Sequence, residues 1–258
     1  MSDPRPRPLR PGDPDRLGSY HLTGLLGGTE QEAVYLGRRP GGPLAAIRLR
    51  HSRFAGDEQA TARFTRAVSA ARRVPASCTA PVLDTRTSRY GQYVATEYIR
   101  GESVERLVTR KGPLGRAALN RLAIGTAALL TGVHEAGVVL REMAPADVIL
   151  GPAGPRIVGF RSAVLLEPVA ARSGGTPGIG TAPGSAAESG PALDVSAWGA
   201  LIMFAATGVP HRPGALQTDP AGTLLPERLR SAVATALDER PGRRPTSVSL
   251  LRALLAED

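Results

Sequence analysis

The 258-residue sequence contains very little lysine. Lys111 is the only one, although lysine and arginine together number 32 and the formal net charge is +9. Arginine therefore carries nearly all of the positive charge, which points first to the codon habit of a GC-rich genome. A basic balance can favour anionic partners, but no stretch interleaves arginine with aromatic side chains, as base stacking requires. We therefore expect a solvated basic surface and no nucleic acid among the partners.

Other features are scarce or missing. Cys78 is the only cysteine, which excludes an internal disulfide framework and predicts a small buried apolar side chain. No apolar run reaches the ~18 residues of a membrane span. The first residues are rich in proline and arginine and lack the apolar region of a signal peptide. We therefore expect a disordered arm over residues 1–17 of a cytoplasmic protein that does not span a membrane.

The next part of the chain, residues 18–100, alternates short apolar runs with turns rich in glycine and proline. This alternation is typical of antiparallel strands. A helix is expected over residues 56–74, because Phe64, Ala67, Val68 and Ala71 fall on one face at helical spacing. The pattern predicts a small antiparallel sheet of five strands with one helix. The expected strands are residues 20–26, 33–36, 44–47, 80–84 and 92–99.

After Gly101 the pattern becomes helical. The length of the chain allows a substantial core. Residues 151–154 read as a hairpin-like turn, and residues 167–190, rich in Gly, Ser, Ala and Pro, read as a loop. Thr246 is expected to cap the last helix. The expected helices are residues 103–110, 115–136, 194–207, 226–237 and 246–256.

The most informative stretch is Leu140-Arg-Glu-Met-Ala-Pro-Ala-Asp147 with the apolar run that follows it. It has the outline of the protein-kinase catalytic loop, His-Arg-Asp-Leu-Lys-Pro-x-Asn followed by a strand. The chain resembles bacterial serine/threonine kinases of the eukaryotic-like type over residues 18–255. The resemblance implies an α+β, two-lobed protein-kinase-like fold, with an N-lobe at 18–100 and a mostly helical C-lobe at 101–258. Further matching phrases are residues 25–37, 64–74, 134–137, 194–199 and 244–246.

The N-lobe departs from the family where nucleotide phosphates are held. Arg48 stands in place of the phosphate-anchoring lysine, and its planar fork is not an equivalent point charge. Ala67 stands in place of the glutamate that pairs with that lysine. The family's G-x-G-x-x-G-x-V loop lets backbone N–H groups approach the phosphates. Here Gly27 is kept, but Thr29 and Glu32 replace the other two glycines, a pattern more typical of a plain β-turn.

The catalytic loop and the metal site depart as well. Glu142 replaces the catalytic aspartate, and a misplacement of ~1 Å can cost ~10²-fold in rate. Ala144 removes a lysine that stabilises the transferring group. Gly159 replaces the aspartate of Asp-Phe-Gly, which is the main metal ligand. Asp147, in place of the metal-binding asparagine, is the one candidate Mg²⁺ contact left, and we do not expect Mg²⁺ to be a cofactor.

Other positions keep the residue types that surround a purine in the family. They predict a pocket for ATP or another purine nucleotide, although the same side chains would also be apolar in an ordinary core. Both interpretations stay open. The candidate nucleotide-binding residues are Leu26, Gly27, Val34, Ala46, Arg48, Thr96, Glu97, Ile99 and Ile149.

The resemblance assigns further residues to the scaffold. Leu140, Phe160 and Asp194 match the stacked positions that link the two lobes. His134 stands where the family carries a buried structural histidine, so we do not expect it to be catalytic. The histidines show no metal-ligand spacing.

Residues 173–184 resemble an activation segment. The segment ends in Ala-Pro-Gly184, so the glutamate that would pair with Arg244 is missing. Ser173, Thr176 and Thr181 are candidate acceptors of phosphate from another kinase. The alternative is a flexible linker without a regulatory role.

Together these substitutions predict a catalytically inactive kinase-like protein, a pseudokinase, acting as a regulatory or scaffolding module. Its partners would be proteins, such as a cognate active kinase or a phosphopeptide-binding protein. The alternative is an atypical ATP-dependent serine/threonine kinase that uses Glu142 as base and Asp147 with Arg48 on the phosphates. A third hypothesis is a purine sensor without catalysis.

Overall fold

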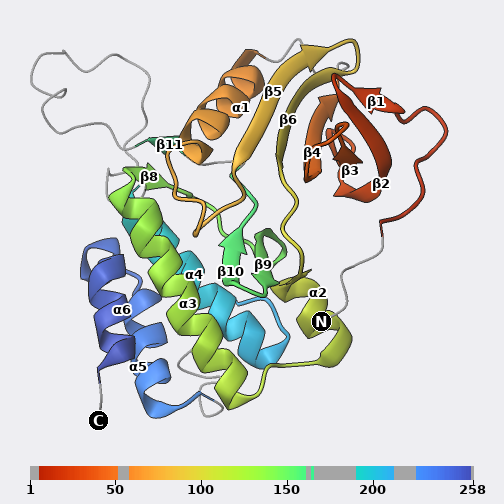
Figure 1. Cartoon of the computed structure of the whole chain (residues 1–258). Helices are drawn as coiled ribbons and strands as arrows, with labels where there is room; N and C mark the ends of the chain where they lie inside the picture. Colours follow the sequence, from red (N-terminus) through yellow and green to blue (C-terminus); the bar gives the residue numbers. More distant parts are fainter. Residues whose placement is uncertain (1–5, 52–57, 161–163, 166–189, 212–224, 257–258) are drawn as a thin grey trace, which may run out of the picture.

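The computed structural model describes residues 6–51, 58–160, 164–165, 190–211 and 225–256. An antiparallel sheet with one helix forms a smaller lobe, and a helical lobe lies below it (Figure 1). This is the two-lobed α+β arrangement that the sequence predicts. The three candidate phosphate acceptors, Ser173, Thr176 and Thr181, lie outside the described residues.

The smaller lobe is built on one antiparallel sheet with strand order β1-β2-β3-β4-β6-β5. This sheet has six strands, so the prediction of five is wrong. Gly18, at φ +57°, turns the chain so that Arg16 and Leu17 pair with His21 and Tyr20, and a strand of two residues is too short to show alternation. The strands are β1 Arg16–Leu17, β2 Tyr20–Gly28, β3 Glu32–Arg38, β4 Leu44–His51, β5 Val82–Ser88 and β6 Gly91–Glu97.

Alternation along β4 decides which side chains face the core and which face the second lobe. Ala45, Ile47 and Leu49 are fully buried in one apolar cluster with tyrosines of the neighbouring strands. Successive side chains of a strand point to opposite faces. Ala46 and Arg48 therefore lie on the other face of the sheet, toward helix α1 (Glu58–Ala71) and the helical lobe.

Residues 6–17 differ from the disordered arm that composition predicts. Arg7 forms an isolated antiparallel bridge with Leu25: the Arg7 amide donates to the Leu25 carbonyl at 2.9 Å, and the Leu25 amide donates to the Arg7 carbonyl at 2.7 Å. Leu9 packs against the apolar cluster of the smaller lobe. Proline favours an extended backbone, so a proline-rich segment can lie along a sheet edge without forming a regular strand.

The larger lobe surrounds a central helix, α4, which is apolar on all sides, as expected of a core helix. Its Trp198 is fully buried, and the indole N–H donates to the Ala123 carbonyl at 3.2 Å and to Thr126 Oγ1 at 3.0 Å. The Thr246 cap is confirmed, since its side chain accepts from the Ser249 amide. The helices are α2 Val104–Lys111, α3 Arg116–Glu135, α4 Pro191–Thr207, α5 Glu227–Ala236 and α6 Ser247–Leu255.

Short strands and a 3-10 turn position the stretch at residues 140–147 between the lobes (Figure 1). Strands β7 (Glu102–Ser103), β9 (Val148–Gly151) and β10 (Gly154–Ile157) form a small sheet in the order β10-β9-β7. The predicted hairpin is confirmed, because Gly151 pairs with Gly154. Strand β8 (Val138–Val139) precedes the central stretch and pairs with β11 (Val164–Leu165). A 3-10 turn, η2 (Pro145–Asp147), ends it.

None of the helices in the described ranges combines the length and the apolarity needed to cross a membrane.

Candidate active site

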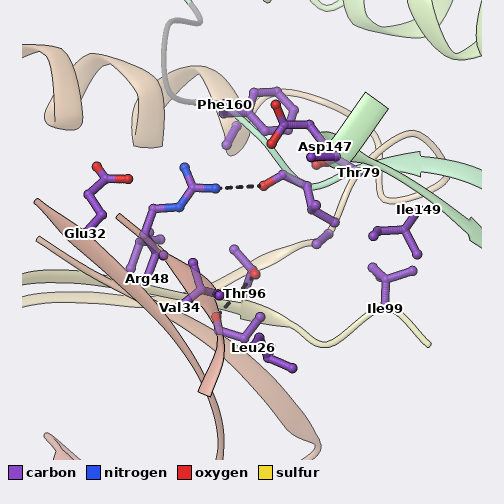
Figure 2. A pocket seen from close by; sticks show the side chains of 18 of the residues that line it. Leu26, Glu32, Val34, Arg48, Thr79, Thr96, Ile99, Asp147, Ile149 and Phe160 are labelled. Carbon is purple, nitrogen blue, oxygen red and sulfur yellow. Dashed lines mark hydrogen bonds between the residues drawn. The ribbon is translucent and has the colours of Figure 1, made fainter. Parts of the chain in front are cut away.

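A cavity of about 790 Å³ opens between the sheet of the smaller lobe and the hairpin of the larger lobe. Figure 2 shows side chains from both lobes pointing into it. The structure therefore brings the predicted nucleotide-binding residues together in one cavity, although their role stays a prediction. All nine candidates line it: Leu26, Gly27, Val34, Ala46, Arg48, Thr96, Glu97, Ile99 and Ile149.

Apolar side chains form the inner part of this cavity. Ile99 and Ile149 lie near one another on one side, and Leu26 and Val34 lie on the sheet side (Figure 2). Thr96 sits opposite Ala46 in the β4–β6 pairing and donates its hydroxyl to the Ala46 carbonyl at 3.4 Å. Apolar side chains and polar backbone thus line this part of the cavity together.

Arg48 connects the two lobes across the cavity. Its guanidinium donates to the Val158 carbonyl at 3.4 Å, just before Gly159 (dashed line in Figure 2). Ala67 of α1 also lines the cavity, so the position expected to hold a partner glutamate carries only a methyl group. Arg48 thus brings a cation to the place where the resemblance expects lysine, held by a carbonyl oxygen of the other lobe.

The turn that covers this end of the cavity is tightly closed. The Thr29 amide donates to the Glu32 carbonyl at 2.7 Å, and Thr29 Oγ1 accepts from the amides of Gln31 and Glu32, each at 3.3 Å. Gly28 has φ +148°, and a Cβ there would overlap the Glu32 carbonyl. Glu32 lines the cavity, whereas Glu30 lines a separate small pocket on the outer side.

Asp147 occupies the space next to Gly159. Asp147 is buried, and its carbonyl accepts from the Val158 amide at 2.9 Å, which holds the two segments side by side. A Cβ built on Gly159 would overlap the carboxyl group of Asp147. The Asp147 carboxylate therefore stands where a side chain at position 159 would stand. Sequence reasoning treated the two substitutions as unrelated.

Asp194 is completely buried, and its hydrogen bonds fix the backbone at the start of the catalytic-loop stretch. Its carboxylate accepts from the Leu140 amide at 2.8 Å and from the Arg141 amide at 2.7 Å. His134 Nε2 lies 2.9 Å from the same carboxylate, and His134 Nδ1 lies 3.0 Å from Ser247 Oγ. Within the described ranges, Arg141 is the only non-glycine residue with a positive φ, +67°, a conformation that costs energy.

These contacts give His134 and Asp194 a structural place, as the resemblance implies. Leu140 and Phe160 are buried in the same apolar cluster of the larger lobe. Arg244 donates to the carbonyl oxygens of Asp238, at 2.9 Å, and Ala192, at 3.1 Å. Hydrogen bonds thus hold these parts of the scaffold even where the family's residue types are replaced.

The candidate base lies outside the cavity wall. Glu142 is exposed, and neither it nor Ala144 is among the residues that line the cavity. Glu142 follows Arg141 directly, so its Cα is positioned by the Asp194 contacts. Its carboxylate is accessible to a large substrate approaching from outside.

Sequence reasoning missed a second arginine in the cavity. Arg50 is buried and donates to Thr61 Oγ1 at 2.9 Å and to Gln92 Oε1 at 3.5 Å. It stands two residues after Arg48 on β4, so strand periodicity would have placed both on one face. Arg63 of α1 lines the cavity as well. Arg48, Arg50 and Arg63 thus line the cavity together with the acidic side chains of Glu32 and Asp147.

The described residues offer a divalent cation few protein ligands. In the described part of the chain no group of three or more His, Cys, Asp or Glu side chains could hold a metal ion unaided. However, Mg²⁺ in nucleotide sites is usually bound by one or two carboxylates together with phosphate oxygens and water. Asp147 meets this lower requirement, because its carboxylate lies in the cavity.

No family model matches the chain. The sequence is 35% identical to a probable serine/threonine-protein kinase, PkwA of Thermomonospora curvata, over 96% of this chain and 35% of that protein. It is 33% identical to the serine/threonine-protein kinase AfsK of Streptomyces coelicolor, over 92% of this chain and 32% of that protein. The chain therefore spans about a third of the length of these relatives.

The fold is similar to that of the kinase domain of PknI from Mycobacterium tuberculosis. The TM-score is 0.68 with 20% sequence identity, over 93% of this chain and 96% of that one. At this identity the similarity shows the fold alone.

Proposed function

The homologues and the fold support the assignment of this chain to the bacterial serine/threonine protein kinase family, and we propose that it is an ATP-dependent serine/threonine protein kinase with an altered active site. The chain spans about a third of its curated relatives. The proposed activity is therefore that of the two-lobed region alone.

This proposal replaces the interpretation of the chain as an inactive pseudokinase and scaffold. The relatives that match most of the chain are named as serine/threonine protein kinases, and this overturns the prediction of inactivity. That prediction rested on the joint loss of the family's lysine, glutamate, catalytic aspartate and metal-binding aspartate. Asp147 bears on the last of these losses, because its carboxyl group lies in the space beside Gly159.

The observation that carries the proposal is the place of the Asp147 carboxylate. By the resemblance, an amide is expected at position 147 and a carboxylate at position 159. Here the carboxylate is at 147, no side chain is present at 159, and the Asp147 carboxyl group fills the volume beside Gly159. An acidic oxygen ligand is thus retained in the cavity, although it comes from another position in the sequence.

The chain's own groups suit the parts of phosphoryl transfer. When bound with ATP, Mg²⁺ supplies neutralisation of charge on the β- and γ-phosphates. Asp147 is the carboxylate that would hold the ion. Arg48 adds a permanent positive charge at the same end of the cavity, and its fork can bind phosphate oxygens in pairs.

Glu142 is the candidate general base. It would accept the proton of the serine or threonine hydroxyl as that oxygen attacks the γ-phosphorus of ATP and ADP leaves. Its exposed position allows a protein substrate to reach it. The Asp194 contacts at Leu140 and Arg141 fix the backbone beside it, which limits the entropy that orientation would otherwise cost.

The test is transfer of labelled γ-phosphate from ATP by the purified chain, to itself or to casein. We expect transfer that requires Mg²⁺ and that falls about 10²-fold or more in Glu142→Gln. Glu135→Gln is the matched control, because Glu135 is exposed on α3 and lies outside the cavity. Absence of transfer by the wild type, or transfer that Glu142→Gln leaves unchanged, would overturn the proposal.

A further inference from the structure

The N-terminal segment, residues 6–15, is hydrogen-bonded to strand β2, which leads into the turn over the cavity. Its first attachment is the pair of hydrogen bonds between Arg7 and Leu25, at 2.9 and 2.7 Å. Pro6 and Pro8 flank Arg7 and have no amide hydrogen. Over these three residues only Arg7 can donate to β2, so the pairing is confined to a single bridge.

Strand β2 carries no side chain at Gly24, where the N-terminal segment crosses it. A Cβ at Gly24 would lie 2.8 Å from the Arg7 carbonyl oxygen and 2.8 Å from the Pro6 Cβ. Such distances are too short for any real side chain. Glycine at position 24 therefore lets the two backbones approach closely.

Two further attachments lie closer to the sheet. The Asp13 carboxylate accepts from the Tyr35 hydroxyl at 2.7 Å with one oxygen and from the Arg10 amide at 2.7 Å with the other. The Asp15 carbonyl accepts from the Leu22 amide at 2.9 Å. Burial, together with the hydrogen bond to Asp13 and the charge of that carboxylate, raises the pKa of Tyr35 above its usual value. The hydroxyl therefore stays protonated and continues to donate to Asp13.

The segment also shares a wall with the turn over the cavity. A pocket of about 480 Å³ is lined by Arg10 and Asp13 on one side and by Gly27, Gly28 and Thr29 on the other. Leu25, the attachment point of Arg7, is in the same strand just before Gly27. The attachment point of Arg7 and the start of the turn thus share both a strand and a pocket wall.

We propose that residues 6–15 form a cis-acting strap whose attachment to β2 restrains the turn at Gly28–Glu32. With the strap attached, the turn is held in the closed geometry described above. With the strap released, β2 keeps its pairing with β1 but loses the hydrogen bonds at Leu22 and Leu25, and the turn gains freedom. The strap is thus a built-in control on the covering of the cavity, whatever ligand the cavity takes.

The test uses a matched pair of variants in the full chain, Arg7→Pro and Arg7→Ala. Both remove an exposed side chain, but only proline also removes the amide that donates to Leu25. The readout is amide hydrogen exchange at Leu25, which reports the attachment, and at Thr29, which reports the turn. No nucleotide is needed, so the result is independent of the proposed kinase activity.

We expect both amides to exchange about three- to tenfold faster in Arg7→Pro, and at wild-type rates in Arg7→Ala. Gly24→Val, which pushes the segment away, is expected to accelerate both amides as well. Faster exchange at Leu25 with unchanged Thr29 would overturn the proposal, because the segment would then be attached without restraining the turn. Unchanged exchange at both amides in Arg7→Pro and Gly24→Val, or equal effects of Arg7→Ala and Arg7→Pro, would also overturn it.

Discussion

The carboxyl group of Asp147 fills the space beside Gly159 that a side chain at position 159 would occupy. The two residues come from different elements, the turn η2 and the stretch after β10, and the hydrogen bond from the Val158 amide to the Asp147 carbonyl keeps them together. In this structure a side chain at position 159 would therefore require Asp147 to move. The same arrangement also keeps a carboxylate in the cavity.

Gly159→Ala is expected to destabilise the chain, because the added methyl group overlaps Asp147 and forces one of them to move. The cost of such overpacking is about 1–3 kcal/mol. Urea unfolding of Gly159→Ala, Asp147→Ala and the double variant measures the coupling between the sites. We expect the penalty at position 159 to shrink in the Asp147→Ala background. Gly242→Ala is the control, since nothing lies within 4 Å of a Cβ there; equal penalties in both backgrounds would contradict the overlap.

Arg48→Met is expected to weaken binding of ATP about tenfold or more, because it removes a charged donor from the phosphate end of the cavity. Isothermal titration calorimetry with ATP and with adenosine separates the loss of phosphate contacts from a general change in the pocket. Adenosine carries no phosphate, so its affinity should fall little. Arg38→Met is the matched control: Arg38 is exposed on the neighbouring strand β3 and lies outside the cavity. An equal loss of affinity for adenosine would indicate a general disturbance of the pocket instead.

Asp194→Ala is expected to cost about 3 kcal/mol or more in the free energy of unfolding. It would leave the buried amide of Leu140 and the partly buried amide of Arg141 without their acceptor, and a buried unsatisfied group costs about 1–3 kcal/mol. It would also remove the support for the positive φ of Arg141. Urea unfolding measures this loss, with Asp238→Ala as a control at a partly exposed position. A loss below about 1 kcal/mol would show that the loop does not depend on Asp194.

The pair of Glu102 and Arg110 predicts a pH dependence of stability. Arg110 donates to both carboxylate oxygens of Glu102, at 3.1 and 2.6 Å. This hydrogen bonding lowers the pKa of Glu102 in spite of its burial. A group with a depressed pKa stabilises the fold above its unfolded pKa of about 4.3, and the contribution is lost as the pH falls through the folded value.

We therefore expect Arg110→Met to be less stable than the wild type at pH 7 and the difference to shrink as the pH is lowered below about 4. Urea unfolding over this range gives the comparison. Arg106→Met, on the same helix, is the control, because Arg106 acts on Glu102 only through its more distant charge. A difference that stays constant with pH would show that Arg110 stabilises the chain by packing alone.

The order of elements could be predicted from the sequence because apolar residues recur in it at helical or strand spacing over long stretches. Helix α3 and strands β2 and β3 appear within two residues of their expected bounds, whereas β4 extends four residues beyond its expected end. Strand β1 could not be predicted, since two residues carry no period. The attachment of residues 6–15 was hidden by a composition typical of disorder, because its hydrogen bonds depend on one amide between two prolines and on a glycine in a distant strand.

The candidate site could be predicted in part. The resemblance named nine residues that do line one cavity, and it named the substituted positions. It could not show that Asp147 lies in the space at Gly159, because that contact depends on side-chain direction and not on spacing. Arg50 was missed, although its place two residues after Arg48 indicates the same face of β4.

The most direct test of the relocated carboxylate is thermal unfolding with ATP, with and without Mg²⁺, in the wild type, Asp147→Ala and Asp147→Ala with Gly159→Asp. We predict that Mg²⁺ adds to the ATP-induced rise in Tm of the wild type. Asp147→Ala should lose this Mg²⁺-dependent part, and the double variant, which returns a carboxylate to position 159, should regain it. A wild type without a Mg²⁺-dependent rise, or an Asp147→Ala variant that keeps it, would contradict the account.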